Sequence, residues 1–502
     1  MRRVQLLALF GPALAVMISA NACSTAGVGT ATAASDQAPM AIPISTQSAI
    51  ARDEFLRGVH DVDVERVVSA RQHFDRALAA DPNFAFGHLY AAYYASSIAS
   101  YRNHLDEAIR LMGGATPAEQ LWIREEQKGA DNDVNGQLAL AQELVRLTPS
   151  DPRAYGYLGL VQFNAGRPAD ARATLERAAQ IDPSFAQTWI ELGNSYLVTE
   201  PRDAAKAETY IRKVVALEPN EAIAHDYMGD VYRAQNNLAQ ARAEYTRMAE
   251  LDPTRGGAFV QRGHVNSFLG NFAEARADYD RAFAADDPTS RPGTAVYRAL
   301  VNVYAGDPSA AESELERVAG SVDAMNIPNA VGSKIFAFSE EARIALHNRH
   351  LDVAQRAVDQ LRTLYRRQAE EGRSDAIRRG NEANIDYWEG MLAARRGDFT
   401  TARNKARDMM AQMAPDQSPR KNEGAHELLG MADLLQGNYQ LAAGHFAEAN
   451  PDDIYVWYHR GLALEGAGRT AEAKEFFRRA AGWNFNGSAT ALVKKDAARR
   501  AA

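Results

Sequence analysis

The chain has 502 residues, of which 46% are hydrophobic and 24% are charged, and its formal net charge is -8 at pH 7. The ordinary apolar fraction excludes wholesale disorder, and the acidic balance argues against nucleic-acid binding, which needs a basic surface. A single cysteine excludes an internal disulfide framework and a cysteine-cluster metal site.

Residues 1–22 have the three-part layout of a secretory signal peptide. A basic start and an apolar stretch lead to small residues at 20–22, just before Cys23. The segment resembles a bacterial lipoprotein signal, which implies lipidation of Cys23 and, from Ser24, the outer membrane. Ala20 stands where that family usually has leucine, so an ordinary secretory cleavage site is the alternative. We expect a cell-envelope protein, either lipid-anchored on the periplasmic face of the outer membrane or soluble in the periplasm.

Residues 23–47 are rich in Ala, Thr, Ser and Gly. Such a composition cannot bury a core, so it predicts a flexible tether.

A repeat of about 34 residues dominates the remainder of the chain. One unit begins with the motif Trp189-x-x-Leu192-Gly193-x-x-Tyr196 and continues with small and large apolar residues before a proline. The pattern returns around residues 152–288 and 383–482, appears as a second half at 49–83, and is weak at 84–150 and 292–370. It resembles the tetratricopeptide repeat (TPR) superfamily, in which each unit is a pair of antiparallel helices.

This resemblance implies an all-α superhelical solenoid of stacked TPR hairpins. We expect a glycine such as Gly193 to pack against a small residue such as Ala207, so that the two helices of a hairpin cross closely. The predicted organisation is an N-terminal solenoid at 48–320, a linker at 321–332 and a C-terminal solenoid at 333–482. The linker either separates two lobes or is only a long turn. Residues 483–502 would form a capping segment with a helix from Ser488 to Arg499.

The resemblance also indicates where a ligand would bind, because the first helix of each TPR unit lines the concave side. Carrying the inner positions over gives a polar set in the first lobe and an apolar, aromatic set in the second. The polar set is Asn194, Asp226, Asp230, Arg233 and His264, and the aromatic set is Tyr387, Met391, Met431, Tyr455 and Tyr458. These surfaces suit a protein or peptide partner of unknown identity.

No catalytic motif is present, and we expect no enzyme activity, no catalytic residue, no cofactor and no metal site. The leading hypothesis is a non-catalytic envelope scaffold that binds protein segments in its groove. The alternative is a binding protein or sensor for cell-wall glycan or peptide ligands, with Tyr387, Trp388 and Trp457 stacking on sugars. An enzyme with its site in the irregular region 292–370 is a third, weaker hypothesis.

Overall fold

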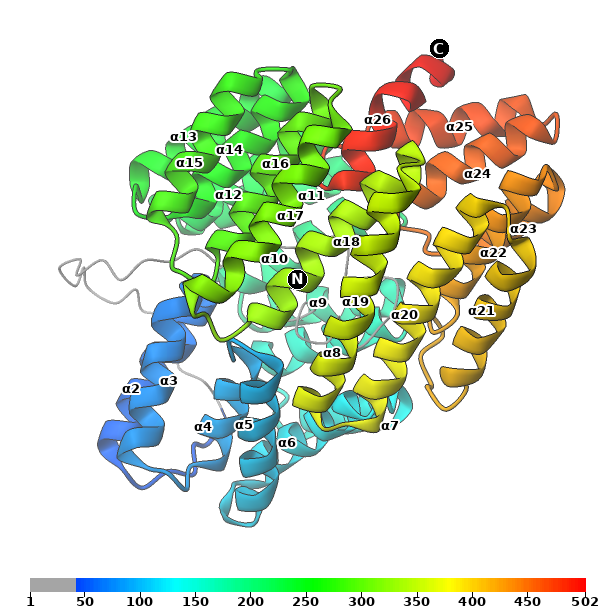
Figure 1. Ribbon diagram of the computed structural model, residues 1–502. Helices are drawn as coiled ribbons and strands as arrows, with labels where there is room; N and C mark the ends of the chain where they lie inside the picture. The colour runs from blue at the N-terminus through cyan, green and yellow to red at the C-terminus, as the bar shows by residue number, and fades with distance from the viewer. Residues whose placement is uncertain (1–41) are drawn as a thin grey trace.

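The computed structural model describes residues 42–502, which form helices and no strand (Figure 1). The predicted signal peptide, Cys23 and most of the predicted tether therefore lie outside the described residues. None of the helices in the described range is both long enough and apolar enough to cross a membrane.

Helices follow one another with short turns, and consecutive helices pack antiparallel as hairpins. In chain order they are α2 (Ala49–Asp63), α3 (Val67–Ala80), α4 (Ala85–Tyr93), α5 (Ile98–Leu111), η2 (Met112–Gly114), α6 (Pro117–Ala130), α7 (Val134–Leu147), α8 (Pro152–Asn164), α9 (Pro168–Ile181), α10 (Ala186–Val198), α11 (Ala204–Leu217), α12 (Ala222–Ala234), α13 (Leu238–Leu251), α14 (Gly256–Leu269), α15 (Phe272–Ala285), α16 (Arg291–Tyr304), α17 (Pro308–Ser321), η3 (Val322–Met325), α18 (Ala330–Asn348), α19 (Leu351–Gly372), α20 (Asp375–Arg396), α21 (Phe399–Gln412), α22 (Glu423–Gln436), α23 (Tyr439–Glu448), α24 (Ile454–Gly466), α25 (Thr470–Ala481) and α26 (Ser488–Ala501). The all-α superhelical repeat fold is confirmed.

Local sequence explains where these helices begin and end. Thr116 and Glu119 form the capping box that opens α6, and Asp151 caps α8 from its side chain while Pro152 occupies the first turn. At the other end, α9 stops before the Asp182-Pro183 pair, because the residue that precedes proline avoids helical geometry.

The close crossing within each hairpin corrects one detail of the sequence reasoning. A Cβ atom at Gly193 would lie 2.5 Å from Cδ1 of Ile211, and one at Gly461 would lie 2.7 Å from the ring of Phe477. The glycine therefore makes room for the large residue four positions after the conserved alanine, whereas Ala207 approaches through its backbone oxygen. The alanine is small for another reason, since it is itself fully buried between helices.

The stack is continuous through residues 321–332, which include η3. Helices α17 and α18 contact each other, and one apolar cluster includes Val318 and Ala319 before this stretch as well as Ala337 and Ile344 after it. The segment thus contains a turn within an unbroken core.

The last residues assigned to the tether, 42–47, run extended along the first helices. Ile42 is buried in the apolar cluster of α2–α8, and the backbone N–H of Ser45 donates to Glu119 Oε1 at 3.0 Å. Residues 42–47 therefore lie against the solenoid.

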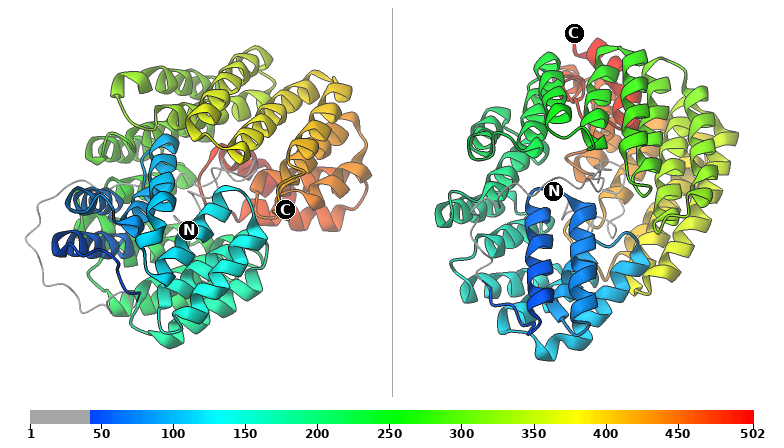
Figure 2. Two further views of the ribbon diagram at one scale, coloured as in Figure 1. Left: turned by 90° about the horizontal axis from the view of Figure 1, so that it is seen from below. Right: turned by 90° about the vertical axis from the view of Figure 1, so that its left-hand side faces the viewer.

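The superhelix curls around a common interior until distant helices meet (Figure 2). Helix α19 contacts α5, Ile377 of α20 is buried in the apolar cluster of the first helices, and Asn132 donates to Asp416 at 2.9 Å. The predicted C-terminal helix is present as α26, which contacts α16 and α18 as well as α24 and α25 (Figure 1). The winding of the chain therefore closes on itself.

Candidate functional site

Four of the five predicted polar residues come together on the inner face of α12 and α14. Arg233 Nη1 donates to Asp230 Oδ1 at 3.0 Å and to Gln261 Oε1 at 2.8 Å, and Gln261 Nε2 donates to Asp226 Oδ1 at 3.1 Å. His264 lies beside them and is 5% exposed. The fifth residue, Asn194, is buried one hairpin earlier, on α10.

Burial sets the protonation of this polar set. It raises the pKa of the Asp230 carboxyl even though Arg233 opposes the shift, and it lowers the pKa of His264 well below its usual range. Burial also disfavours the charge on Arg233, but the nearby Tyr245 and Asp230 hold the guanidinium pKa above its ordinary value. The site therefore presents a fixed cation beside a neutral imidazole.

An extended part of the same chain covers this polar set. Residues 483–487, here called the inner segment, link α25 to α26 without helical structure. Arg233 bonds to Asn484, and His264 bonds to Asn486, at 2.9 and 2.8 Å respectively. The inner surface of α12 and α14 thus holds an extended polypeptide.

The predicted aromatic set is buried in the second half of the molecule. Met391 and Met431 belong to the apolar core, and the Tyr387 hydroxyl donates to Glu427 Oε1 at 2.9 Å. The ring of Tyr455 lies 5.2 Å from the guanidinium carbon of Arg343, while the Tyr458 hydroxyl donates to Asp496 of α26 at 2.6 Å. These side chains are packed within the closed molecule, and their role in binding stays a prediction.

Sequence reasoning missed that this second region is strongly charged. Arg343 on α18 is buried near Glu427 and Asp453, and burial together with Asp453 raises the pKa of Glu427 to about 7. A charged residue next to apolar residues on the buried face of a helix could have indicated this cluster. Glu427, which precedes Leu428 and Leu429 in α22, is such a residue.

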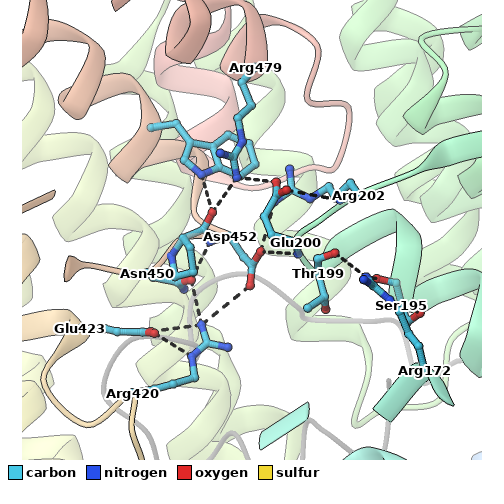
Figure 3. A network of polar contacts seen from close by, with 12 residues as sticks. Arg172, Ser195, Thr199, Glu200, Arg202, Arg420, Glu423, Asn450, Asp452 and Arg479 are labelled. Atoms are coloured by element: carbon cyan, nitrogen blue, oxygen red, sulfur yellow. Dashed lines mark hydrogen bonds and ion pairs between the residues drawn. The ribbon is translucent and has the colours of Figure 1, made fainter. Parts of the chain in front are cut away.

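A second polar network joins the middle of the chain to its last hairpins (Figure 3). The backbone N–H of Glu200 donates to Asp452 Oδ1 at 3.2 Å, and Arg479 Nη2 donates to Glu200 Oε1 at 2.5 Å. Arg202 lies 3.4 Å from Asp452 Oδ1, and its guanidinium sits over Trp457 at 4.3 Å from the ring centroid. We call these residues the closure network, because they hold the α10–α11 turn against the α23–α24 loop and α25.

The edges of the closure network are also anchored. Arg420 donates to Glu423 Oε1 at 2.8 Å and to Asn450 Oδ1 at 2.9 Å. Arg172 donates to the backbone oxygens of Ser195 and Thr199 at 2.7 and 2.8 Å (Figure 3). Since every guanidinium here has an acceptor, the network ties parts of the molecule together.

The closure network depends on an irregularity in the repeat. The glycine and the large residue that face each other are 16 residues apart in Gly461 and Phe477, but 18 apart in Gly193 and Ile211. The two additional residues lengthen the α10–α11 turn, which carries Glu200 and Arg202. The turn with the two additional residues therefore contacts the last hairpins through Glu200 and Arg202.

In the described part of the chain, no group of three or more His, Cys, Asp or Glu side chains lies close enough together to hold a metal ion. His347 and His350 are close in the sequence, as two ligands of one metal ion could be, but they contact different residues. His347 Nδ1 lies 3.1 Å from the Tyr455 hydroxyl, and His350 Nδ1 lies 2.8 Å from Glu312 Oε1.

The fold and its inner surface define a helical-hairpin repeat protein. Two models described as tetratricopeptide repeat match the sequence, one over residues 137–184 and 200–255 and the other over 454–486. These matches show tetratricopeptide repeats over those residues, within the all-α superhelical repeat fold of the described chain. No enzyme family is indicated.

Solved structures with a similar arrangement come from several sources. The chain is similar to the APC/C hetero-tetramer Cut9-Hcn1 at 14% identity, with 90% of this chain and 77% of that chain covered and a TM-score of 0.38. It is also similar to a tetratricopeptide repeat protein from Parabacteroides merdae (13%, 58% and 98% covered, 0.35) and to PilF of Pseudomonas aeruginosa (21%, 45% and 96%, 0.30). No curated protein sequence matches the chain.

Proposed function

We propose that this protein is a non-catalytic scaffold of the bacterial cell envelope that binds segments of other proteins on its inner surface. The observation that carries the proposal is the inner segment, an extended stretch of polypeptide that α12 and α14 hold through hydrogen bonds to its backbone and side chains. Recognition of extended segments by inner helices fits a repeat fold that typically serves protein–protein interaction.

The glycan-binding alternative has less support. Trp388 and Trp457 are 3% and 1% exposed, and Trp457 is covered by the guanidinium groups of Arg202 and Arg479. An aromatic ring must present a free face to stack on a sugar, so neither indole is available in the closed form.

Site-specific photo-crosslinking in the native cell tests the proposed function. A photoreactive residue would replace Phe268, which is half-buried beside Tyr304 on the inner surface. A matched probe would replace Leu441 on α23, which is 60% exposed. We expect a discrete protein adduct from position 268 and none of the same mass from position 441. The same adduct from both positions, or from position 441 alone, would contradict the proposal.

The envelope location is a further part of the proposal and rests on the resemblance around Cys23. Wild-type protein should enter the membrane fraction, and Cys23→Ala protein should remain soluble in the periplasmic fraction. If both proteins are soluble there, lipidation is wrong, and the scaffold proposal is tested separately by the crosslinks.

A further inference from the structure

The inner segment, residues 483–487, differs from the other inter-helix connections in where it lies. After α25 it runs across the inner face of α12, α14 and α16. The residues that it contacts there precede it by more than 180 positions in the sequence. Lys494 of α26 holds its beginning by donating to the backbone oxygens of Ala481 and Trp483 at 2.5 and 2.7 Å.

Asn484 makes a reciprocal pair of bonds with one residue of α12. Arg233 Nε donates to the Asn484 backbone oxygen at 2.9 Å, and Asn484 Nδ2 donates to the Arg233 backbone oxygen at 2.9 Å. The Asn484 amide also donates to Asn236 Oδ1 at 3.0 Å. The inner face therefore binds both the backbone and the side chain at this position.

Phe485 lies between these two asparagines and makes mainly ring contacts. The Arg233 guanidinium carbon is 4.6 Å from its ring centroid, and the ring of Trp483 is 4.7 Å away. Phe485 also packs against the apolar cluster of α9–α12. A cation over one ring face and apolar neighbours favour an aromatic side chain here.

Asn486 is read by side chains from three helices. Its Nδ2 lies 2.8 Å from His264 Nδ1 and 3.2 Å from the Tyr279 hydroxyl, and its Oδ1 accepts from the Tyr304 hydroxyl at 2.7 Å. Because His264 is buried and its pKa is lowered, its Nδ1 can accept a hydrogen bond. The Tyr279 hydroxyl also lies 2.7 Å from His264 Nδ1. An aspartate at 486 would lack the amide donor that faces both His264 and Tyr279, so these partners favour an amide over a carboxylate.

The fit of the inner segment is incomplete. Asn484 is fully buried, yet its Oδ1 has no hydrogen-bond partner. A buried acceptor without a partner costs free energy. The resident segment therefore occupies the site with a defect that another polypeptide could avoid.

We propose that the inner face of α12, α14 and α16 is a recognition site for an extended segment of another protein with an Asn-aromatic-Asn pattern, and that residues 484–486 are its resident competitor. The inference rests on the proposed function and specifies its ligand. An attached segment acts at an effective concentration on the order of 1 mM, so a partner must outcompete it. Partner binding is then coupled to release of the inner segment.

The test uses the full chain and a fluorescent heptapeptide with the sequence of residues 482–488, Gly-Trp-Asn-Phe-Asn-Gly-Ser. In the variant Asn484→Ala/Asn486→Ala, the resident competitor loses its side-chain bonds. We expect fluorescence anisotropy to show at least about tenfold tighter binding of the peptide to this variant than to wild type. A control peptide with both asparagines replaced by aspartate should bind the variant at least about tenfold more weakly than the first peptide, since it lacks both amide donors.

Three results would overturn the inference: no peptide binding to the variant, equal binding to variant and wild type, or equal binding of the two peptides. Circular dichroism verifies that the variant is helical. If it is not, the single variant Asn486→Asp takes its place with the same expectation and the same criteria. If the peptide does not bind but position 268 still gives the protein adduct in the native cell, only this inference is overturned. If position 268 gives no adduct, the proposed function is overturned.

Discussion

Arg233 Nε and the backbone oxygen of Asn484 are joined by a hydrogen bond of 2.9 Å across 251 residues of sequence. Arg233 also bonds to Asp230 and Gln261, so a single guanidinium links the packing of two hairpins to the inner segment. The polar residues of the interior therefore hold parts of the chain together as well as forming a binding surface. Variants can separate these two roles.

The closure network should control the overall dimensions of the molecule. In Glu200→Ala/Asp452→Ala, Arg202 loses its acceptor on the α23–α24 loop and Arg479 loses its acceptor on the α10–α11 turn, each worth about 2 kcal/mol as a charged hydrogen bond. Arg479 keeps only its bond to the backbone oxygen of Pro451, which does not reach the α10–α11 turn. We expect the radius of gyration from small-angle X-ray scattering to rise above the value of about 23 Å for a compact chain of this length.

The exposed pair of Arg167 and Asp170 supplies the control for that experiment. Asp170→Ala removes an ion pair within a single helical turn and should leave the scattering curve unchanged. Identical curves for the closure variant and wild type would show that the other long-range contacts suffice for closure.

Two glycines in neighbouring hairpins should respond oppositely to alanine. In Gly461→Ala the new Cβ would lie 2.7 Å from the ring of Phe477, so we expect a loss of about 1–3 kcal/mol from overpacking. In Gly444→Ala nothing lies within 4 Å, and the helix should gain up to about 1 kcal/mol. Thermal unfolding followed by circular dichroism measures both, and a destabilised Gly444→Ala would contradict the packing argument.

Glu126 should make the protein less stable as the pH rises. Its carboxyl is buried, with the Tyr101 hydroxyl at 2.7 Å and Glu125 beside it, and burial raises its pKa to about 7. Between pH 4.5 and 7 the folded state binds more protons at this group than the unfolded state, so the free energy of unfolding falls by about 3 kcal/mol. In Glu126→Gln the decline of the melting temperature over this window should be smaller.

The exposed Glu143→Gln variant controls for a general effect of removing a carboxylate. A pH profile of Glu126→Gln that parallels wild type would mean that the buried carboxyl does not carry this dependence.

His347 should contribute in the opposite direction on the acid side. Burial, assisted by Arg395, lowers its pKa to about 4, so the imidazole is neutral in the folded protein at neutral pH. Below pH 6.5 the unfolded state binds more protons at this residue, and stability is lost down to about pH 4. His347→Phe should flatten this acid limb in thermal melts recorded from pH 7 to 4, and an unchanged limb would refute the assignment.

The repeat pattern in the sequence could predict the contacts within a hairpin and between adjacent hairpins. The spacing of Gly193, Leu192 and Trp189 predicts a hairpin and its stacking, and the helix starting at Ser488 follows from local pattern. The signal is weak where α18, α19 and α20 are 19, 22 and 22 residues long, because such helices do not keep a period of 34.

Closure could not be predicted in the same way. The inner positions carried over from the family brought Arg233 and His264 together, but nothing local to Asn484 or Asn486 indicates a partner more than 200 residues away. The charged cluster around Arg343 could not be predicted for the same reason. Its carboxylates, Glu427 of α22 and Asp453 at the start of α24, come near Arg343 only in the folded superhelix.

The lengthened turn at Glu200 also changes the character of unfolding. A linear array frays at its terminal repeat, which has a neighbour on one side only. Here the hairpin of α24 and α25 is flanked by α23 on one side and by α26 on the other, and Arg479 also ties α25 to Glu200 of the α10–α11 turn. The amide protons of α25 should therefore exchange as slowly as those of helices in the middle of the array. In a closed ring of repeats, unlike in an open one, no terminal repeat is free to fray first.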